Sequence, residues 1–379
     1  MPDVSPNADQ AAITTYVALD VHKRSIVAAV LPALGGEAEL HEIPNTERAI
    51  RRLIERLGDP DRLSVCYEAG PCGYAPYRLL SRIGVATDVV APSLIPTRAG
   101  DRVKTDRRDA RKLARLYRAG ELSFVRPPSP EQEGLRDLMR CLDDLTAARR
   151  AARHRIAKQL LRYDRIHPGK KSWTKEHREW VTAQRLDDPL ADEALAQMRV
   201  HLGSLDAQIE ALELRLEEIA RTDRWVEPVR WLTSFRGIAT KTALGLIAEI
   251  GDFRRFCSAR ELMSFLGLVP SEYSSGEQRH RGHITKSGNR HARRLVVEAA
   301  WHYQHRPNLS KRQRELAPLL PAEVAARAWR AQVRLNHRHL ALQRQGKRST
   351  VANVAVAREL TGFVWAAMTD QPLREEVSA

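Results

Sequence analysis

Four carboxylates in the first 110 residues stand at the ends of predicted elements. Asp20 ends one predicted apolar strand, and Glu68 follows another. Asp106 and Asp109 are three residues apart at the start of a predicted helix, so both can project from the same face of that helix. If the two strands are neighbours in one sheet, several acidic side chains meet at its edge.

Carboxylates that converge in this way repel one another unless a divalent cation neutralises them. Mg2+ prefers such hard oxygen ligands and keeps bound waters for chemistry, and two such ions can hold the attacking and leaving oxygens of a phosphodiester. Taken singly, Asp106 could simply cap its helix, Asp109 could be a solvated charge and Glu68 could be ordinary loop polarity. The order strand Asp, strand-end Glu and helix Asp-x-x-Asp favours a Mg2+ site instead.

Ser275 is a second candidate for chemistry, because it precedes Gly276 and a strongly basic segment. Attack on a phosphodiester needs an exposed hydroxyl and cations that neutralise the charge on the phosphorane. Ser-Ser-Gly is also a common loop tripeptide. The residue types alone therefore leave a nucleophile and a plain loop both open.

Basic residues outnumber acidic ones, with 62 Lys and Arg against 47 Asp and Glu and a formal net charge of +15. This balance favours a polyanionic partner, first of all nucleic acid, because Lys and Arg gain by neutralising phosphates and releasing counterions. Solubility alone is the simpler alternative. The candidate nucleic-acid contacts are basic residues near the sites above: Lys104, Arg107, Lys241, Arg279, Arg281, Lys286 and Arg290.

The cysteines and the N-terminus indicate a cytoplasmic protein. The four cysteines form no Cys-x-x-Cys pair and show no zinc spacing, so we expect reduced thiols. Residues 1–14 are polar and contain no Lys or Arg, and no apolar run approaches the length of a membrane span. We therefore expect no membrane contact.

The first domain is predicted over residues 14–128 as an α/β sheet. Its expected elements are strands over 16–20, 25–31 and 37–43, a helix over 48–57, a strand over 63–67, a helix over 74–83, a strand over 87–91 and a basic helix over 106–119. Three strands followed by alternating helix and strand are typical of a ribonuclease H-like fold. Pro127, Pro128 and Pro130 mark the end of this domain.

A helical region is predicted next, over residues 129–225. Apolar residues alternately three and four apart form a heptad seam typical of a coiled coil: Leu195, Met198, Leu202, Leu205, Ile209, Leu212, Leu216 and Ile219. An earlier arm carries Leu135, Leu138, Leu142 and Leu145, and residues 168–171 read as a loop between the arms. The region can fold back as an antiparallel hairpin within one chain, or it can join subunits into a homo-oligomer.

The third domain, over residues 226–369, is predicted to be mainly α-helical. Residues 235–250 resemble a helix-hairpin-helix, in which a tight glycine turn lets backbone NH groups at a helix start meet a phosphate. Ala239 stands where that motif usually has a second glycine, so a bare helical turn is the alternative reading.

The chain as a whole resembles the transposases of the insertion-sequence one-ten (IS110) family. The resemblance covers about residues 14–369, and its most specific stretches are residues 18–23, 67–70, 104–110 and 245–301. It implies an N-terminal RuvC-like domain, a coiled coil and a C-terminal transposase domain.

The same resemblance implies the roles of individual residues. It implies a metal site formed by Asp20, Glu68, Asp106 and Asp109, and a catalytic serine at Ser275, with Ser274 as the fallback. It also implies DNA cutting and rejoining through a serine-linked intermediate. A noncoding guide RNA encoded by the element, which pairs with target and donor DNA, is implied by the resemblance and by no feature of composition or spacing.

Two other functions compete with a transposase. One is a metal-dependent nuclease resembling a Holliday-junction resolvase, which would still cut DNA after Ser275→Ala. The other is a nonenzymatic nucleic-acid-binding protein, which would show no Mg2+-dependent cleavage.

Overall fold

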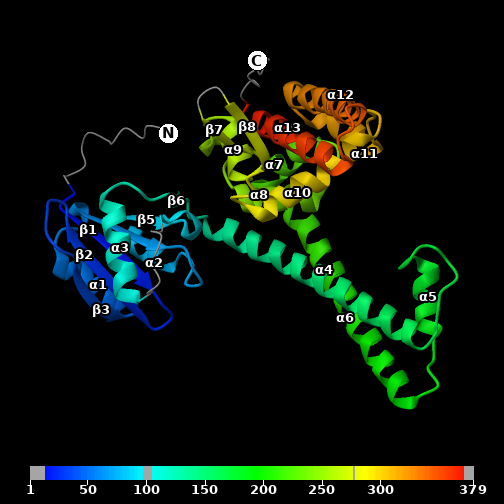
Figure 1. The fold of residues 1–379 in the computed structure, drawn as a ribbon, viewed down its shortest axis with the longest axis horizontal. Coiled ribbons are helices and arrows are strands. Elements are labelled where there is room, and N and C mark those ends of the chain that lie inside the picture. The colour runs from blue at the N-terminus through cyan, green and yellow to red at the C-terminus, as the bar shows by residue number, and fades with distance from the viewer. Residues whose placement is uncertain (1–12, 97–104, 276–277, 371–379) are drawn as a thin grey trace. The chain divides into compact units, whose positions relative to one another are not determined.

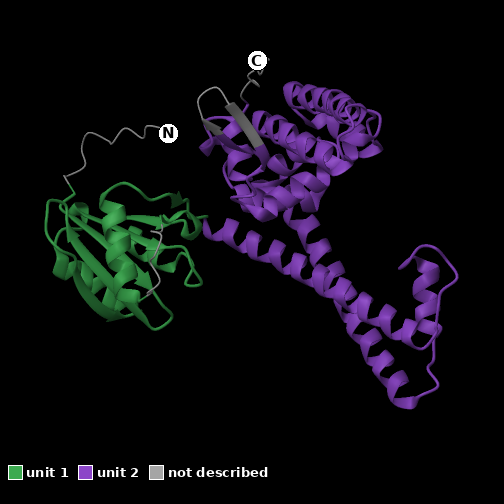
Figure 2. Cartoon of the chain, viewed as in Figure 1, with its two compact units in different colours: residues 1–128 green, residues 129–379 purple. Residues whose placement is uncertain are grey.

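A computed structural model describes residues 13–96, 105–275 and 278–370. The chain separates into two compact units, residues 1–128 and residues 129–379 (Figure 2). The helical region and the C-terminal region, predicted as separate domains, lie together in the second unit.

The first unit is built on a six-stranded mixed sheet with the strand order β3-β2-β1-β4-β5-β6. β1 (Thr15–Val21), β2 (Ser25–Pro32) and β3 (Glu39–Pro44) form an antiparallel meander. β4 (Leu63–Glu68) and β5 (Ala86–Val90) continue the sheet in parallel with β1, and β6 (Phe124–Val125) closes it antiparallel to β5. The predicted α/β class of this domain is confirmed.

Helices cover both faces of this sheet (Figure 1). α1 (Glu47–Leu57) and α2 (Ala75–Arg82) pack on one face, and α3 (Asp106–Arg118) packs on the other. Because successive side chains of a strand point to opposite faces, each strand feeds both cores. In β1, Val17 and Leu19 belong to the core of α1 and α2, whereas Ala18 belongs to the core of α3.

The second unit begins with a long helical hairpin. α4 (Pro130–Arg162) and α6 (Pro189–Ile219) pack along each other, and α5 (Lys175–Ala183) lies at the tip between them (Figure 1). The helices run antiparallel, since Gln159 near the end of α4 bonds Ala191 near the start of α6. The predicted heptad seam contributes buried leucines to this intrachain packing, among them Leu195 and Leu205. A coiled coil between subunits stays a prediction.

The rest of the second unit is mainly helical. Its helices are α7 (Asp223–Thr233), α8 (Thr240–Ile250), α9 (Ala259–Phe265), α10 (Arg290–Ala300), α11 (Lys311–Leu316), α12 (Ala322–Arg344) and α13 (Ser349–Thr369). The helix α13 buries most of its residues and packs against α9, α10 and α12. Five short 3-10 turns complete the described part of the chain: Pro60–Arg62, Pro92–Leu94, Phe253–Arg255, Trp301–Gln304 and Ala317–Leu319.

A two-stranded hairpin of β7 (Pro270–Ser275) and β8 (Gln278–Ile284) interrupts these helices. The sequence pattern does not predict it, because a strand signal needs apolar residues on one face. In β7, Ser271, Glu272 and Tyr273 are all exposed. Over the described ranges, no helix is long and apolar enough to cross a membrane.

Candidate metal site and serine hairpin

Asp20 and Glu68 lie at the carboxyl ends of neighbouring parallel strands. β1 and β4 pair with Leu19 opposite Tyr67, so the next residue on each strand is an acid. Leu19 and Tyr67 both face the core of α1 and α2, and strand alternation therefore directs the following residues to the α3 face. Two acids from separate segments thus reach the same edge and the same face of the sheet.

The start of α3 brings two more acids to this unit's α3 face. Thr105 caps the helix, because its Oγ1 accepts a hydrogen bond from the backbone NH of Arg108 at 3.4 Å. Asp106 and Asp109 then occupy the first turn. The positive end of the helix dipole favours carboxylates at this position.

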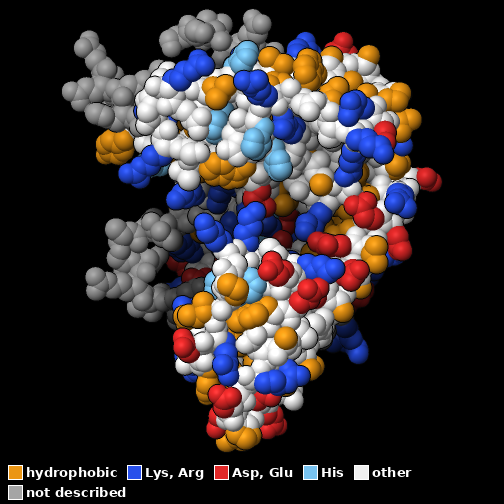
Figure 3. Space-filling model, turned by 90° about the vertical axis from the view of Figure 1, so that its right-hand side faces the viewer, with side chains coloured by type: hydrophobic (Ala, Val, Ile, Leu, Met, Phe, Trp, Pro, Cys, Tyr) orange, Lys and Arg blue, Asp and Glu red, His pale blue; other side chains and the backbone are white. Residues whose placement is uncertain are grey.

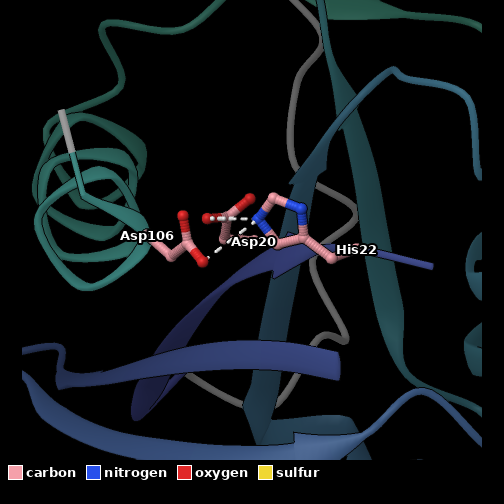
Figure 4. A group of neighbouring side chains, drawn as sticks. All are labelled: Asp20, His22 and Asp106. Atoms are coloured by element: carbon pink, nitrogen blue, oxygen red, sulfur yellow. Dashed lines mark hydrogen bonds and ion pairs between the residues drawn. The ribbon is translucent and has the colours of Figure 1, made fainter. Parts of the chain in front are cut away.

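His22 links the strand and the helix (Figure 4). Its Nε2 lies 3.2 Å from Asp20 Oδ2 and 3.5 Å from Asp106 Oδ2. The turn between β1 and β2 holds the histidine in place, since its NH donates to Ser25 O at 2.9 Å and its carbonyl accepts from Asn45 at 2.8 Å. His22 was not predicted as a site residue, although the Asp-x-His pair at the end of a predicted strand is visible in the sequence.

The carboxylates of this site interact electrically. Burial raises the pKa of the Asp20 carboxyl above its ordinary value, His22 opposes this rise, and the negative charges of Asp106 and Asp109 add to it. The Asp20 side chain is 24% exposed, so water screens these charges incompletely. A positive charge placed among these groups would therefore be stabilised.

Three of these groups are close enough to hold one ion. Ligand atoms of Asp20, His22 and Asp106 lie within 4.8 Å of one another. Among the described residues, Glu68 and Asp109 are outside this triad, Glu68 at the adjacent strand end and Asp109 one helical turn on. The donor set, which is mainly carboxylate oxygen, fits a hard divalent cation such as Mg2+.

Ser275 ends β7, and its backbone pairs with Gln278 of β8, while Ser274 pairs with Arg279. The side chains of residues 274–281, which include the predicted contacts Arg279 and Arg281, lie outside the described part of the chain, as does Lys104. The structure thus brings the candidate serine to the end of a β-hairpin.

The base of this hairpin is anchored by two glycines. Gly267 and Gly288 both have positive φ, and a Cβ on either would clash with backbone oxygen, of Ser287 and of Phe265 respectively. Asn289 completes the anchor, because its NH donates to Phe265 O at 2.8 Å. Only glycine permits this close approach of the loop after β8 to the end of α9.

A buried carboxylate, that of Glu249, also holds the base of the hairpin. The side chain of Glu249 in α8 is 4% exposed and accepts hydrogen bonds from Asn289 at 2.8 Å and from Arg140 at 3.0 and 3.2 Å. Arg136 lies 3.9 Å away. Burial alone would raise the pKa of Glu249, but the bonds from Arg140 and Asn289 and the charges of Arg140 and Arg136 outweigh it and lower the pKa. The group therefore stays charged and joins α4, α8 and α10.

Two of the predicted nucleic-acid contacts have partners within the chain. Lys241 Nζ lies 2.9 Å from Glu213 Oε1 of α6, and Arg107 lies 3.6 Å from Glu42 with both side chains exposed. The turn before Lys241 is the predicted glycine turn, and it joins the packed helices α7 and α8. Thr240 at the start of α8 is buried and accepts a hydrogen bond from Arg312.

Lys286 and Arg290 lie beside the hairpin anchor, and both are exposed. Figure 3 shows Lys and Arg side chains recurring over the face in view, in keeping with the formal charge of +15. These two residues are therefore accessible to a polyanion, and their binding to nucleic acid stays a prediction.

Two family models match the chain. Residues 17–164 match a model described as a transposase of the DEDD type in the IS110 group, and residues 229–315 match the model described as the transposase IS116/IS110/IS902 family. The first match includes all four predicted acids, and the second includes Ser275.

Two of the relatives described here align with most of the chain, and a third aligns with about three fifths of it. The protein y4qE of Sinorhizobium fredii is 40% identical over 93% of this chain and 87% of that protein. The transposase for insertion sequence element IS1533 of Leptospira borgpetersenii is 31% identical over 88% of this chain and 98% of its own length. The transposase for insertion sequence element IS1111A of Coxiella burnetii is 27% identical over 62% of this chain and 65% of its own length.

Proposed function

Because the chain belongs to the IS110 family of insertion-sequence transposases, which act on DNA, we propose that it cuts and rejoins DNA strands through a covalent link to Ser275. A divalent cation held near Asp20 assists. Membership of a transposase family argues against a nonenzymatic nucleic-acid-binding protein. A metal-dependent nuclease that uses no serine remains one outcome of the test below.

The chemistry at Ser275 conserves phosphodiester bonds. The serine Oγ attacks a DNA phosphorus, its bond to phosphorus forms, the bond from phosphorus to one deoxyribose oxygen breaks, and that oxygen takes up the proton. A hydroxyl of another DNA end then attacks the phosphoserine ester, which rejoins the strand and frees the serine. No external energy source is needed, since each bond broken is replaced by one of the same kind.

The position of the hairpin supports this role. Ser275 lies at the end of β7, next to a glycine, and the base of the hairpin is held by Glu249 and Asn289. A site on a rigidly anchored element keeps a nucleophile in line with its target. Lys286 and Arg290, both exposed, can neutralise charge on the phosphate oxygens.

The carboxylates of the first unit would hold the cation. Asp20 and Asp106 supply oxygen ligands, with Glu68 and Asp109 as further acids at the same sheet face. His22 bonds Asp20 and lies 3.5 Å from Asp106, so it can orient both carboxylates, as residues around metal ligands commonly do. When bound, Mg2+ supplies charge neutralisation and polarises the phosphate oxygens.

Sequence choice belongs to a partner RNA in this proposal. A noncoding guide RNA pairs with donor and target DNA, and the protein holds nucleic-acid backbones through Lys and Arg, which carry no sequence information themselves. The proposal of a guide RNA is supported by the resemblance of residues 14–369 to the family. The same resemblance supports assembly into a homo-oligomer through the helical hairpin.

Covalency decides the mechanism. Wild-type protein trapped on a nicked DNA substrate is expected to form an adduct that survives denaturation, and Ser275→Ala is expected to form none, because metal-activated water leaves no protein on the DNA. Ser274→Ala is the matched control and should keep the adduct.

Two results would change this assignment. If the adduct survives in Ser275→Ala and is lost in Ser274→Ala, the nucleophile is the preceding serine. If wild-type protein cleaves DNA without any adduct, the metal-dependent nuclease replaces the serine mechanism.

A further inference from the structure

The distal half of α4 is basic and carries no acidic residue. Residues 145–163 contain six Lys and Arg and no Asp or Glu, whereas residues 130–144 contain five Asp and Glu against two Arg. α6, its packing partner, carries seven Asp and Glu against two Arg. Positive charge is therefore concentrated on one segment of the hairpin, and not spread evenly along it.

Within this segment the cations follow one face of the helix. Arg150, His154, Lys158 and Arg162 are each four residues apart, which places them in a row, and all four are exposed. The row spans about 18 Å at 1.5 Å per residue. The opposite face of α4 carries Ala152, Ile156 and Leu160, which are buried against α6. The basic row thus takes no part in holding the hairpin together.

One end of the row opens into a cavity of about 270 Å³. Its lining residues are Thr146, Arg149, Arg150, Arg153, His154 and Trp173. The guanidinium of Arg153 lies over the Trp173 ring, 5.1 Å from its centroid. This stacking holds the guanidinium in a defined orientation at the cavity wall.

The cavity has more positive charge than its acids can neutralise. Arg149 and Arg153 share a single carboxylate, that of Asp206, at 3.3 and 3.5 Å. Arg150 has no ion-pair partner within the described ranges, and Arg153 Nε is buried without a hydrogen-bond acceptor there. Burial lowers the pKa of Arg153, and the charge of Arg149 lowers it further, while Asp206 opposes this. An anion in the cavity would relieve these costs.

We propose that the cavity and the basic row on α4 bind the sugar–phosphate backbone of a nucleic-acid strand, with one phosphate in the cavity and its neighbours along the row. An ordinary solvated helix face explains exposed cations, but it does not explain a cavity walled by three guanidiniums, of which two share the carboxylate of Asp206 and the third, Arg150, has no ion-pair partner among the described residues. The hairpin is then a nucleic-acid arm of the transposase. This inference is independent of the serine and the metal, because neither contributes to the arm.

The test uses the full chain with Arg150→Gln and Lys158→Gln combined, since neither side chain has a partner in the described structure that the change would break. The matched control is Arg221→Gln with Lys347→Gln, which removes the same charge from exposed positions of the same unit. Binding to a random-sequence DNA duplex and to a single-stranded RNA of equal length is measured over a range of salt concentrations. Unchanged thermal unfolding verifies that the variants are folded.

Losing two phosphate contacts should lower the slope of log affinity against log salt by about 1.8 for duplex DNA, and should weaken binding about tenfold or more at 0.1 M salt. The control should change the slope by less. An effect on DNA alone identifies DNA as the strand on the arm, and an effect on RNA alone identifies RNA. The proposal is overturned if the slope and affinity of the test variant match those of the control for both nucleic acids. The proposal would also be overturned if free inorganic phosphate binds in the cavity while the test variant binds both nucleic acids as the control does. The cavity would then be a site for a small anion only.

Discussion

Replacing Glu249 by Gln tests how the Ser275 hairpin is held. The carboxylate accepts two hydrogen bonds from Arg140 and one from Asn289, and its side chain is 4% exposed. Glutamine keeps the volume but loses the charge, and one of its two terminal atoms becomes a donor. With its oxygen at the Oε2 position, glutamine can still accept from Asn289 and from Arg140 Nη2, but its NH2 group then faces Arg140 Nε, and that bond is lost.

Removing one partner of a buried ion pair costs about 3–5 kcal/mol. The Arg140 side chain is 47% exposed and can regain water, so we expect the lower end, about 3 kcal/mol in the free energy of unfolding. For a unit of about 250 residues, each kcal/mol lowers Tm by about 2–4 °C, which gives a fall of about 6–12 °C. Differential scanning calorimetry at neutral pH measures it. Adduct formation below the unfolding temperature should also fall, because the lost charge and the lost Arg140 Nε bond loosen the base of the hairpin.

The pH dependence has a defined sign. The folded protein holds the pKa of Glu249 below its ordinary value, so the charged carboxylate contributes stability above that value, near pH 4.5, and this contribution is lost as pH falls through the folded pKa. The difference in Tm between wild type and Glu249→Gln should therefore shrink below about pH 4.5.

Glu298→Gln is the matched control, because Glu298 is an exposed acid that pairs with Arg294 one turn away on α10. Such a pair contributes about 0.5 kcal/mol or less. If Glu249→Gln lowers Tm no more than Glu298→Gln does, the reasoning about the buried anchor is refuted.

The remaining predictions concern the ion and the seam. Asp20→Asn should abolish DNA cleavage without unfolding the protein, and His22→Ala should weaken Mn2+ binding about ten- to a hundredfold in titration calorimetry; cleavage and ion affinity that both stay at wild-type level would contradict the site. Leu205→Glu combined with Leu212→Glu should cost more than about 3 kcal/mol of stability, because Leu205 is buried between α4 and α6. Light scattering on the same variant then shows whether the seam also joins subunits, and an unchanged Tm would contradict the intrachain packing.

Local signals in the sequence determined most of the first unit. Strand alternation, helix caps and turn residues act between near neighbours, so they are legible without the fold, and the predicted β1, β2, β4 and α3 begin or end within one or two residues of the observed ones. The same signals put Asp20 and Glu68 at strand ends and Asp106 at a helix start. The heptad spacing also showed which residues form the apolar side of α6, because the spacing of apolar residues along a helix determines which of them share a side.

Contacts between distant segments were decided only by the tertiary structure. His22 becomes a site residue because the turn after β1 and the start of α3, more than 80 residues apart, meet at one sheet edge. Glu249 is buried and charged only because Arg140 and Asn289 converge on it from 109 and 40 residues away. The seam of α6 packs against α4 of the same chain, a choice that apolar periodicity leaves open because a leucine face fits either partner. Each of these depends on which surfaces meet, and a one-dimensional pattern carries no information on that.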